Sequence, residues 1–380
     1  MRRVVRPSLI LIAVLLAGCL DRIFGPRKKK ADYAIDCEPA LVTLPRGSAG
    51  TVSCTVTSKN GFANEVGLSA SNLPAGVTMV FGSASVKPPK NGSTTVWAQV
   101  AIGNSVNPST NPWTVVGSSG GTTHSWNGSL GVVEKTATVH LVYLVPSDRQ
   151  QRDDFARRME GAIRHAQIWY LNTLGNGKTF AISHPSVAIY KTPHPASWYS
   201  TNNPGDASVF RFSNNVQADG LPLAGARVDD PDNVWVLYID APAGAGQAPG
   251  SGGRGIAVID GTWLARLGQK DAAGNCPAVG ILAHELGHAF ANLADLPDCG
   301  TGGIICPPYP VMGNGSGRYP DAALRPEEKE ALNARRVFLP LRLSTKLFDC
   351  SQLSSADLGS QSVSANVAPN GPLYRCMTPE

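Results

Sequence analysis

The residues with the clearest capacity for chemistry are those of the pentapeptide HELGH at 284–288. His284 and His288 are four residues apart, so on a helix they project from one face about one turn apart. Two imidazoles at this spacing can bind a single Zn²⁺, and Glu285 on the adjoining face can reach a metal-bound water. Zinc lowers the pKa of such a water, and Glu285 can accept its proton as the water attacks a polarised peptide carbonyl. The pattern therefore predicts zinc-dependent hydrolysis with Glu285 as general base.

A helix has to position these groups, and the surrounding sequence predicts one. Apolar residues recur at helical spacing through CPAVGILAHELGHAFANLAD. They are Val279, Leu282, Leu286, Phe290 and Leu293. We therefore expect the HELGH segment to lie on a largely buried helix.

The sequence around and beyond this helix resembles the metzincin family of zinc peptidases. HELGHAF is followed by PVMG at 310–313, which is similar to the Met-turn beneath the zinc of that family, with Met312 as its methionine. The segments YLVPSD, QIWY, GKTF and GRYPDAALRPEEKEAL are also similar to bacterial secreted or anchored metzincin-like proteins. The resemblance covers roughly residues 140–340 and implies an α+β zinc peptidase domain.

The third zinc ligand departs from the family pattern. Metzincins read HExxHxxGxxH or HExxHxxGxxD, but here Ala291 and Ala294 occupy the glycine and ligand positions. The DLPD segment at 295–298 resembles the usual turn and ligand displaced by a four-residue insertion. On that alignment Asp298 is the third ligand, and Pro297 helps to break the helix.

Two alternatives to Asp298 remain open. Asp295 is one, although an unbroken helix would place it about 10 Å along the axis from His288. The other is a downstream glutamate, as in other zinc peptidases: Glu327, Glu328 or Glu330. Tyr319 could hydrogen-bond a tetrahedral intermediate, but packing below the site is the favoured interpretation of this residue.

The first residues of the chain predict export. Residues 1–18 combine three arginines with an apolar run from Leu9 to Ala17, which is typical of a signal peptide. LAGC at 16–19 resembles a bacterial lipobox, which implies cleavage before Cys19 and lipidation of this cysteine. We expect an exported protein, anchored by lipid to the bacterial outer membrane or cell surface.

Charge argues against a nucleic-acid partner. The net charge is +5, but removal of the three signal arginines leaves 30 Lys and Arg against 28 Asp and Glu, or +2. This small net charge does not indicate a nucleic-acid-binding surface. The lysines at 28–30 belong to a predicted basic tether at 19–30.

Seven cysteines follow Cys19, in keeping with an oxidising compartment. Their spacing suggests three disulfides and leaves Cys276 unpaired. The suggested pairs are Cys37–Cys54, Cys299–Cys306 and Cys350–Cys376.

Composition shifts divide the mature chain into three parts. Residues 31–143 alternate short Val- and Thr-rich runs with Gly, Pro and Asn turns, and the LPAGV turn resembles bacterial immunoglobulin-like sandwiches. Residues 144–345 form the predicted peptidase domain, which begins with a strand followed by an amphipathic helix over 148–175 that ends at Gly175. We predict His165 in this helix to be a surface or partly buried residue and not a ligand. Residues 346–380 are predicted to be a disulfide-tied tail.

The glycine-rich segment at 242–255 does not predict nucleotide binding. It leads into an apolar strand at 256–259 and not into a helix amino terminus, so it lacks phosphate-cradling geometry. We predict a flexible loop before an edge strand, and such a strand can pair with an extended peptide through its backbone.

Together these features predict a membrane-anchored zinc endopeptidase on an immunoglobulin-like stalk, acting on a protein or peptide substrate. The alternative is a non-catalytic surface module with a degenerate metallopeptidase fold that binds protein or glycan. The departure at the third ligand favours this alternative, whereas the intact Glu285 favours the enzyme.

Overall fold

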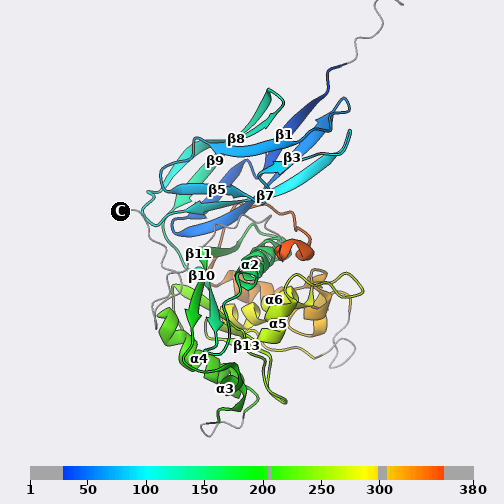
Figure 1. Ribbon diagram of the computed structural model, residues 1–380. Coiled ribbons are helices and arrows are strands. Elements are labelled where there is room, and N and C mark those ends of the chain that lie inside the picture. The colour runs from blue at the N-terminus through cyan, green and yellow to red at the C-terminus, as the bar shows by residue number, and fades with distance from the viewer. Residues whose placement is uncertain (1–28, 204–207, 298–305, 355–380) are drawn as a thin grey trace, which may run out of the picture.

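The computed structural model describes residues 29–203, 208–297 and 306–354, which Figure 1 draws in colour. The predicted signal peptide, Cys19, Asp298, Cys299 and Cys376 lie outside the described residues. The fold is β-rich and multidomain, with a two-sheet unit followed by a unit of strands and helices.

The N-terminal unit consists of two sheets that share one hydrophobic core. Side chains alternate between buried and less buried along its strands, as expected for sheets with one face packed on a core. Cys37 faces Cys54 in the register of β1 and β3, and the predicted disulfide between them is confirmed. One sheet contains β1 (Asp32–Glu38), β3 (Ser48–Lys59), β7 (Ser93–Ile102) and β5 (Val77–Phe81); the other contains β2 (Leu41–Pro45), β9 (Thr122–Val133), β8 (Ser109–Ser119), β4 (Val66–Ser71) and β6 (Ser85–Val86).

The second unit is built on four parallel strands and an antiparallel edge strand, in the order β13-β14-β12-β10-β11. Successive side chains of β10 enter different cores, one beneath α2 and α6 and the other beneath α4, so this strand is buried on both faces. The strands are β10 (Thr138–Val145), β11 (Thr179–Lys191), β12 (Asn233–Ile239), β13 (Gly250–Gly253) and β14 (Ile256–Ile259); the helices are α2 (Asp153–Leu174), α3 (Ala196–Thr201), α4 (Arg211–Ala224), α5 (Gly261–Arg266), α6 (Pro277–Ala291) and α7 (Pro326–Asn333). Shorter elements are β15 (Tyr309–Pro310), η1 (Asn314–Arg318), β16 (Ala322–Ala323), β17 (Phe338–Leu339) and η2 (Cys350–Ser354).

Helix α2 begins later than predicted. It starts at Asp153, with Arg152 as its N-cap residue, and the Asp148 side chain accepts a hydrogen bond from the backbone N–H of Ala196 instead. It ends as predicted, with Gly175 in the left-handed conformation. His165 is almost completely buried, so the prediction of a surface or partly buried position was wrong.

Strand β10 shows that the second unit starts earlier than residue 144. All of β10 pairs in parallel with β11 and β12, and its residues from 138 onward belong to the sheet of the second unit. The predicted 256–259 strand, β14, is also not an edge, since β13 covers its outer side. The glycine-rich segment itself therefore supplies the edge strand.

The two units are joined by more than the connection before β10. Ile182 and Ser183 of β11 pair with the end of β3, so one sheet runs through both units (Figure 1). The segment after α7 then returns across the junction, and Leu341 and Leu343 enter the core of the N-terminal unit. The N-terminal unit and the second unit consequently share buried surface.

A second disulfide corrects the predicted pairing of the C-terminal cysteines. Cys350 bonds to Cys276, 74 residues away in sequence, and not to Cys376. Cys276 was predicted to be unpaired, but it is the residue that immediately precedes α6 and lies against η2. The Cys299–Cys306 pair lies outside the described residues because Cys299 is not among them.

Two disulfides in the described residues fit an extracytoplasmic location. None of the helices in the described ranges is long and apolar enough to cross a membrane.

Candidate metal centre

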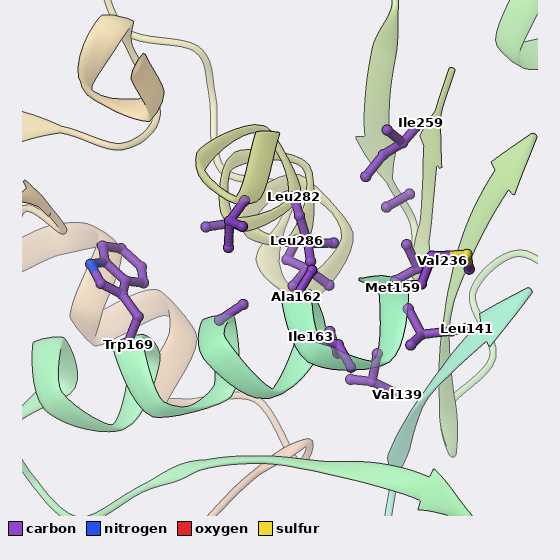
Figure 2. Packing of buried hydrophobic residues seen from close by; sticks show 14 of the residues in the cluster. Val139, Leu141, Met159, Ala162, Ile163, Trp169, Val236, Ile259, Leu282 and Leu286 are labelled. Carbon is purple, nitrogen blue, oxygen red and sulfur yellow. The ribbon is translucent and has the colours of Figure 1, made fainter. Parts of the chain in front are cut away.

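Helix α6 carries the HELGH segment and lies against α2 and the central sheet. Figure 2 shows Leu282 and Leu286 above Ala162 of α2, with Val236 of the sheet beside them. Of the apolar positions predicted from helical spacing, Val279, Leu282, Leu286 and Phe290 are buried and anchor the helix, whereas Leu293 lies beyond its end. With these positions buried, the histidines of the same helix are fixed on a rigid element.

The two histidine side chains converge on one point with a carboxylate. The Nε2 atoms of His284 and His288 are 3.0 Å apart. An Oδ1 atom of Asp295 lies 3.1 Å from the first and 3.2 Å from the second. The histidine side chains are only 15% and 14% exposed, whereas that of Asp295 is 75% exposed, so the cluster opens to solvent on the aspartate side.

Backbone carbonyls determine which nitrogen of each histidine is available. The Nδ1 of His284 lies 2.9 Å from the carbonyl oxygen of Val311, and that of His288 lies 2.5 Å from the carbonyl oxygen of Leu293. A carbonyl can only accept, so each Nδ1–H donates, and in the neutral imidazole each Nε2 keeps a free lone pair. Burial lowers the pKa of His284, which favours its neutral, ligand-competent form.

These donor atoms fit a zinc ion. Two imidazole lone pairs and a carboxylate oxygen repel one another at about 3 Å, and a proton or a metal cation between them removes this repulsion. Ligands about 2.0–2.1 Å from a tetrahedral zinc lie roughly 3.3 Å from one another, close to the separations found here. Carbonyl partners on the opposite ring nitrogens are the usual outer shell of zinc-bound histidines. His284, His288 and Asp295 could therefore hold the metal.

Asp295 reaches the histidines because α6 ends before it. Asn292 adopts the left-handed conformation, with φ 51°, and its N–H donates to the carbonyl of His288. The chain then turns back, and Leu293 supplies the carbonyl for His288 on the way to Asp295. The assumption of an unbroken helix through residue 295, which had disfavoured Asp295, was wrong.

The glutamates of α7 are not brought to the histidines. Asp298 lies outside the described residues. Glu327, Glu328 and Glu330 are on α7, where the Glu328 carboxylate accepts a hydrogen bond from the N–H of Arg325 at the start of the helix. Among the described residues, Glu285 also has a carboxylate oxygen within 4.8 Å of the histidine donor atoms, so it lies beside the three ligand atoms.

Glu285 is a buried carboxyl group beside the ligand atoms. Its Oε2 atom has no hydrogen-bond partner among the described residues. Burial, with a smaller effect of the negative charge of Asp295, raises the pKa of Glu285 to about 8. A nearby bound cation would oppose this rise. An unpartnered carboxylate here is available to exchange a proton with a water or substrate at the cluster.

Strand β13 passes directly over this carboxylate. A Cβ atom on Gly250 would lie 2.5 Å from Oε1 of Glu285, and one on Gly252 would lie 2.7 Å from Cβ of His288. Only glycine permits this close approach of backbone to helix at these two positions. The predicted flexible glycine-rich loop is thus in part a strand that shields the general-base candidate from water.

Met312, the predicted Met-turn methionine, packs against α6 beside the histidines. It is fully buried, and a Cβ atom on Gly287 would lie 2.4 Å from its sulfur. The preceding residue, Val311, supplies the carbonyl that orients His284. The segment therefore supports the histidines through both a side chain and a main-chain group.

Tyr319 does not reach the metal cluster. It is completely buried, and its hydroxyl lies 2.7 Å from Nδ1 of His165. The packing interpretation of this tyrosine fits the structure.

Sequence reasoning ranked Asp295 too low and missed the roles of Asn292, Leu293 and Val311. Asparagine is, after glycine, the residue most tolerant of the left-handed conformation that ends a helix. Asn292 was therefore a usable signal for the helix end, displaced by one residue from the expected glycine position. The two carbonyl partners could not be found, because backbone groups leave no mark on residue type.

Comparison with known proteins does not assign the chain to a family. No protein-family model matches it, and no curated protein does. A solved family 123 glycoside hydrolase from Clostridium perfringens is similar over 34% of this chain and 32% of its own, with 11% identity and a TM-score of 0.25. A FixG-related protein from Vibrio parahaemolyticus is similar over 27% of this chain and 97% of its own, with 11% identity and a TM-score of 0.22. The chain thus spans about a third of the first of these proteins, and neither likeness carries an argument about fold or function.

Proposed function

We propose that this protein is a zinc-dependent endopeptidase with a metzincin-like catalytic domain. The observation that carries the proposal is the convergence of two histidine Nε2 atoms and an Asp295 oxygen next to the buried, unpartnered carboxyl group of Glu285. This arrangement provides three metal ligands and a proton acceptor, with the side of the exposed Asp295 left open.

Each residue has a distinct part in peptide hydrolysis. His284, His288 and Asp295 hold the ion, which when bound supplies a Lewis acid for the carbonyl and lowers the pKa of water. Glu285 accepts a proton from the attacking water and returns it to the leaving amine. The burial of Glu285 under β13 keeps bulk water from competing for this carboxylate.

The substrate proposed for this site is an extended polypeptide. Strand β13 is the last strand of its sheet, and its outer backbone groups can pair with such a chain. Its position over Glu285 and His288 would bring a paired peptide to the cluster. This places the predicted substrate pairing on β13 instead of on residues 256–259.

The proposed setting is the bacterial cell envelope. The lipobox-like segment supports a lipid anchor on Cys19, and the disulfides support an extracytoplasmic location. The N-terminal two-sheet unit supports an immunoglobulin-like sandwich between anchor and catalytic domain.

Zinc content and peptide cleavage by full-length protein in detergent test the proposal. We expect about one zinc per chain and cleavage of an unfolded protein such as casein. Glu285→Gln should keep the zinc and lose roughly 10²–10⁴-fold in rate, the usual worth of a general base. A folded protein with no zinc, or undiminished cleavage by Glu285→Gln, would contradict the proposal and favour a non-catalytic binding module.

A further inference from the structure

The free edge of β13 is interrupted at one end by the segment before α4. The N–H of Ala248 donates to the carbonyl of Val209, with a distance of 2.9 Å. Ala248 precedes by two residues Gly250, which lies against Glu285. Two residues of extended chain span about 7 Å, and a neighbouring strand lies about 5 Å away. Val209 is therefore placed two to three peptide residues from the reacting group.

Val209 and Phe210 expose unusual apolar surface at this point. Their exposed fractions are 52% and 51%, the largest among the exposed large hydrophobic residues in the described part of the chain. Together, at the end of an open strand edge, these two adjacent side chains offer apolar contact area to a peptide paired there.

The position of Phe210 in α4 strengthens this interpretation. It is the N-cap residue of α4, and its side chain supplies no hydrogen bond to the helix. Serine, threonine, aspartate and asparagine stabilise this position by accepting a hydrogen bond from the first turn. A half-exposed phenylalanine provides no such cap and leaves part of its ring available to a ligand.

The opposite end of the β13 edge is polar. The N–H of Arg254 donates to the side chain of Asn292, with a distance of 2.8 Å. The guanidinium of Arg254 is paired with Asp229. Apolar recognition is thus available at only one end of the four-residue edge.

We propose that Val209 and Phe210 form a subsite for a large hydrophobic side chain of an extended peptide paired with β13. The subsite lies two to three residues from the bond that is hydrolysed. The inference rests on the proposed function for its choice of ligand, since it names a substrate preference of the same site.

Peptide binding tests the subsite separately from catalysis. The probes are two capped decapeptides of Ser, Gly and Thr, one with a single central Phe and the other with Ser in its place. Calorimetry measures binding to the full-length, zinc-supplemented Glu285→Gln protein. The same measurement is repeated after Phe210→Ser, Val209→Ser or Val133→Ser is added to Glu285→Gln. Val133 is an exposed valine in the N-terminal unit and serves as the matched control.

We expect the Phe peptide to bind about tenfold or more tightly than the Ser peptide, as burial of one aromatic side chain allows. Phe210→Ser and Val209→Ser should each reduce this preference at least several-fold, whereas Val133→Ser should leave it unchanged. Phe210→Ser should leave the thermal midpoint nearly unchanged, because the side chain is half exposed, so its lost binding cannot be attributed to unfolding.

Three results would overturn the subsite: binding of neither peptide, an unchanged preference in both variants, or an equal loss in Val133→Ser. A retained Phe preference without casein cleavage by the wild type would refute the peptidase and keep the subsite. Casein cleavage with no Phe preference would support the peptidase and refute the subsite.

Discussion

Two regions of this protein bury histidines on helices, and their ring nitrogens are satisfied in different ways. In α2, the Nε2–H of His165 donates to the carbonyl of Phe348, at 2.9 Å, and Nδ1 accepts from the hydroxyl of Tyr319, at 2.7 Å. In α6, His284 and His288 each use one nitrogen for a carbonyl and aim the other at a shared point. The first region is closed to a ligand, whereas the second is open to one.

The difference teaches that burial and helical placement do not identify a functional histidine. His165 is more deeply buried than either HELGH histidine, yet it ties α2 to the C-terminal segment and to the segment beyond Met312. What distinguishes the metal centre is an excess of acceptors: lone pairs converge there without protons to share.

The largest expected effect separates the two regions by zinc content. His284→Ala should lower zinc affinity by more than the roughly 10–100-fold that loss of an outer-shell partner costs, because it removes a ligand. His165→Gln should retain about one zinc per chain. Metal analysis after dialysis against a graded chelator checks both. Equal zinc loss in the two variants would remove the distinction between the regions.

The next effect concerns the carboxylate that completes the open cluster. Asp295→Asn should weaken zinc binding by at least about tenfold, because the ion loses an anionic ligand. Asp298→Asn should leave the affinity unchanged. Competition with a fluorescent zinc chelator measures both constants. A larger loss of zinc affinity in Asp298→Asn than in Asp295→Asn would instead support Asp298, the ligand that the family resemblance implied.

The closed region should reveal itself in the pH dependence of stability. Burial, opposed by the hydrogen bond to Phe348, lowers the pKa of His165 from 6.5 to about 4. Above pH 6.5 the imidazole is neutral whether folded or unfolded, so His165 makes no pH-dependent contribution there. As the pH falls towards 4 only the unfolded state takes up the proton, and stability should fall by up to about 3 kcal/mol.

Denaturant titrations of wild type and His165→Gln between pH 7.5 and 4.5 measure this pH-dependent loss of stability. The variant should lose less stability over this range, so the two curves should converge as the pH falls. Curves that stay parallel would show that His165 is protonated in the folded protein and that its region is not closed.

The smallest expected effect tests the support beneath the open region. Gly287→Ala places a methyl group against the buried sulfur of Met312 and should cost about 1–3 kcal/mol of unfolding free energy through overpacking. Gly317→Ala is the matched control, since a Cβ atom there meets nothing within 4 Å. Thermal unfolding of both variants compares them. Equal stability of the two variants would mean that the Met312 side chain moves aside and does not hold α6 in place.

Much of the fold was predictable where the signal was local. Apolar spacing predicted α6 and most of α2, and alternation with turns predicted several strands of the N-terminal unit. Cys37 and Cys54 are close in sequence on adjacent strands, which made their disulfide predictable as well. The long-range disulfide was not predictable, because Cys350 bonds across 74 residues to Cys276, although Cys376 is closer in sequence.

The same division holds within the candidate site. The sequence by itself determined the histidine pair, Glu285 between them and a methionine segment to support them, because helical spacing alone projects residues four apart from one face. Only the tertiary structure decided that Asp295 joins them, that carbonyls of Val311 and Leu293 orient them, and that glycines of β13 cover Glu285. The physical reason is that these contacts depend on where the chain turns and what packs beside it, and neither is encoded in the spacing of residues along one helix.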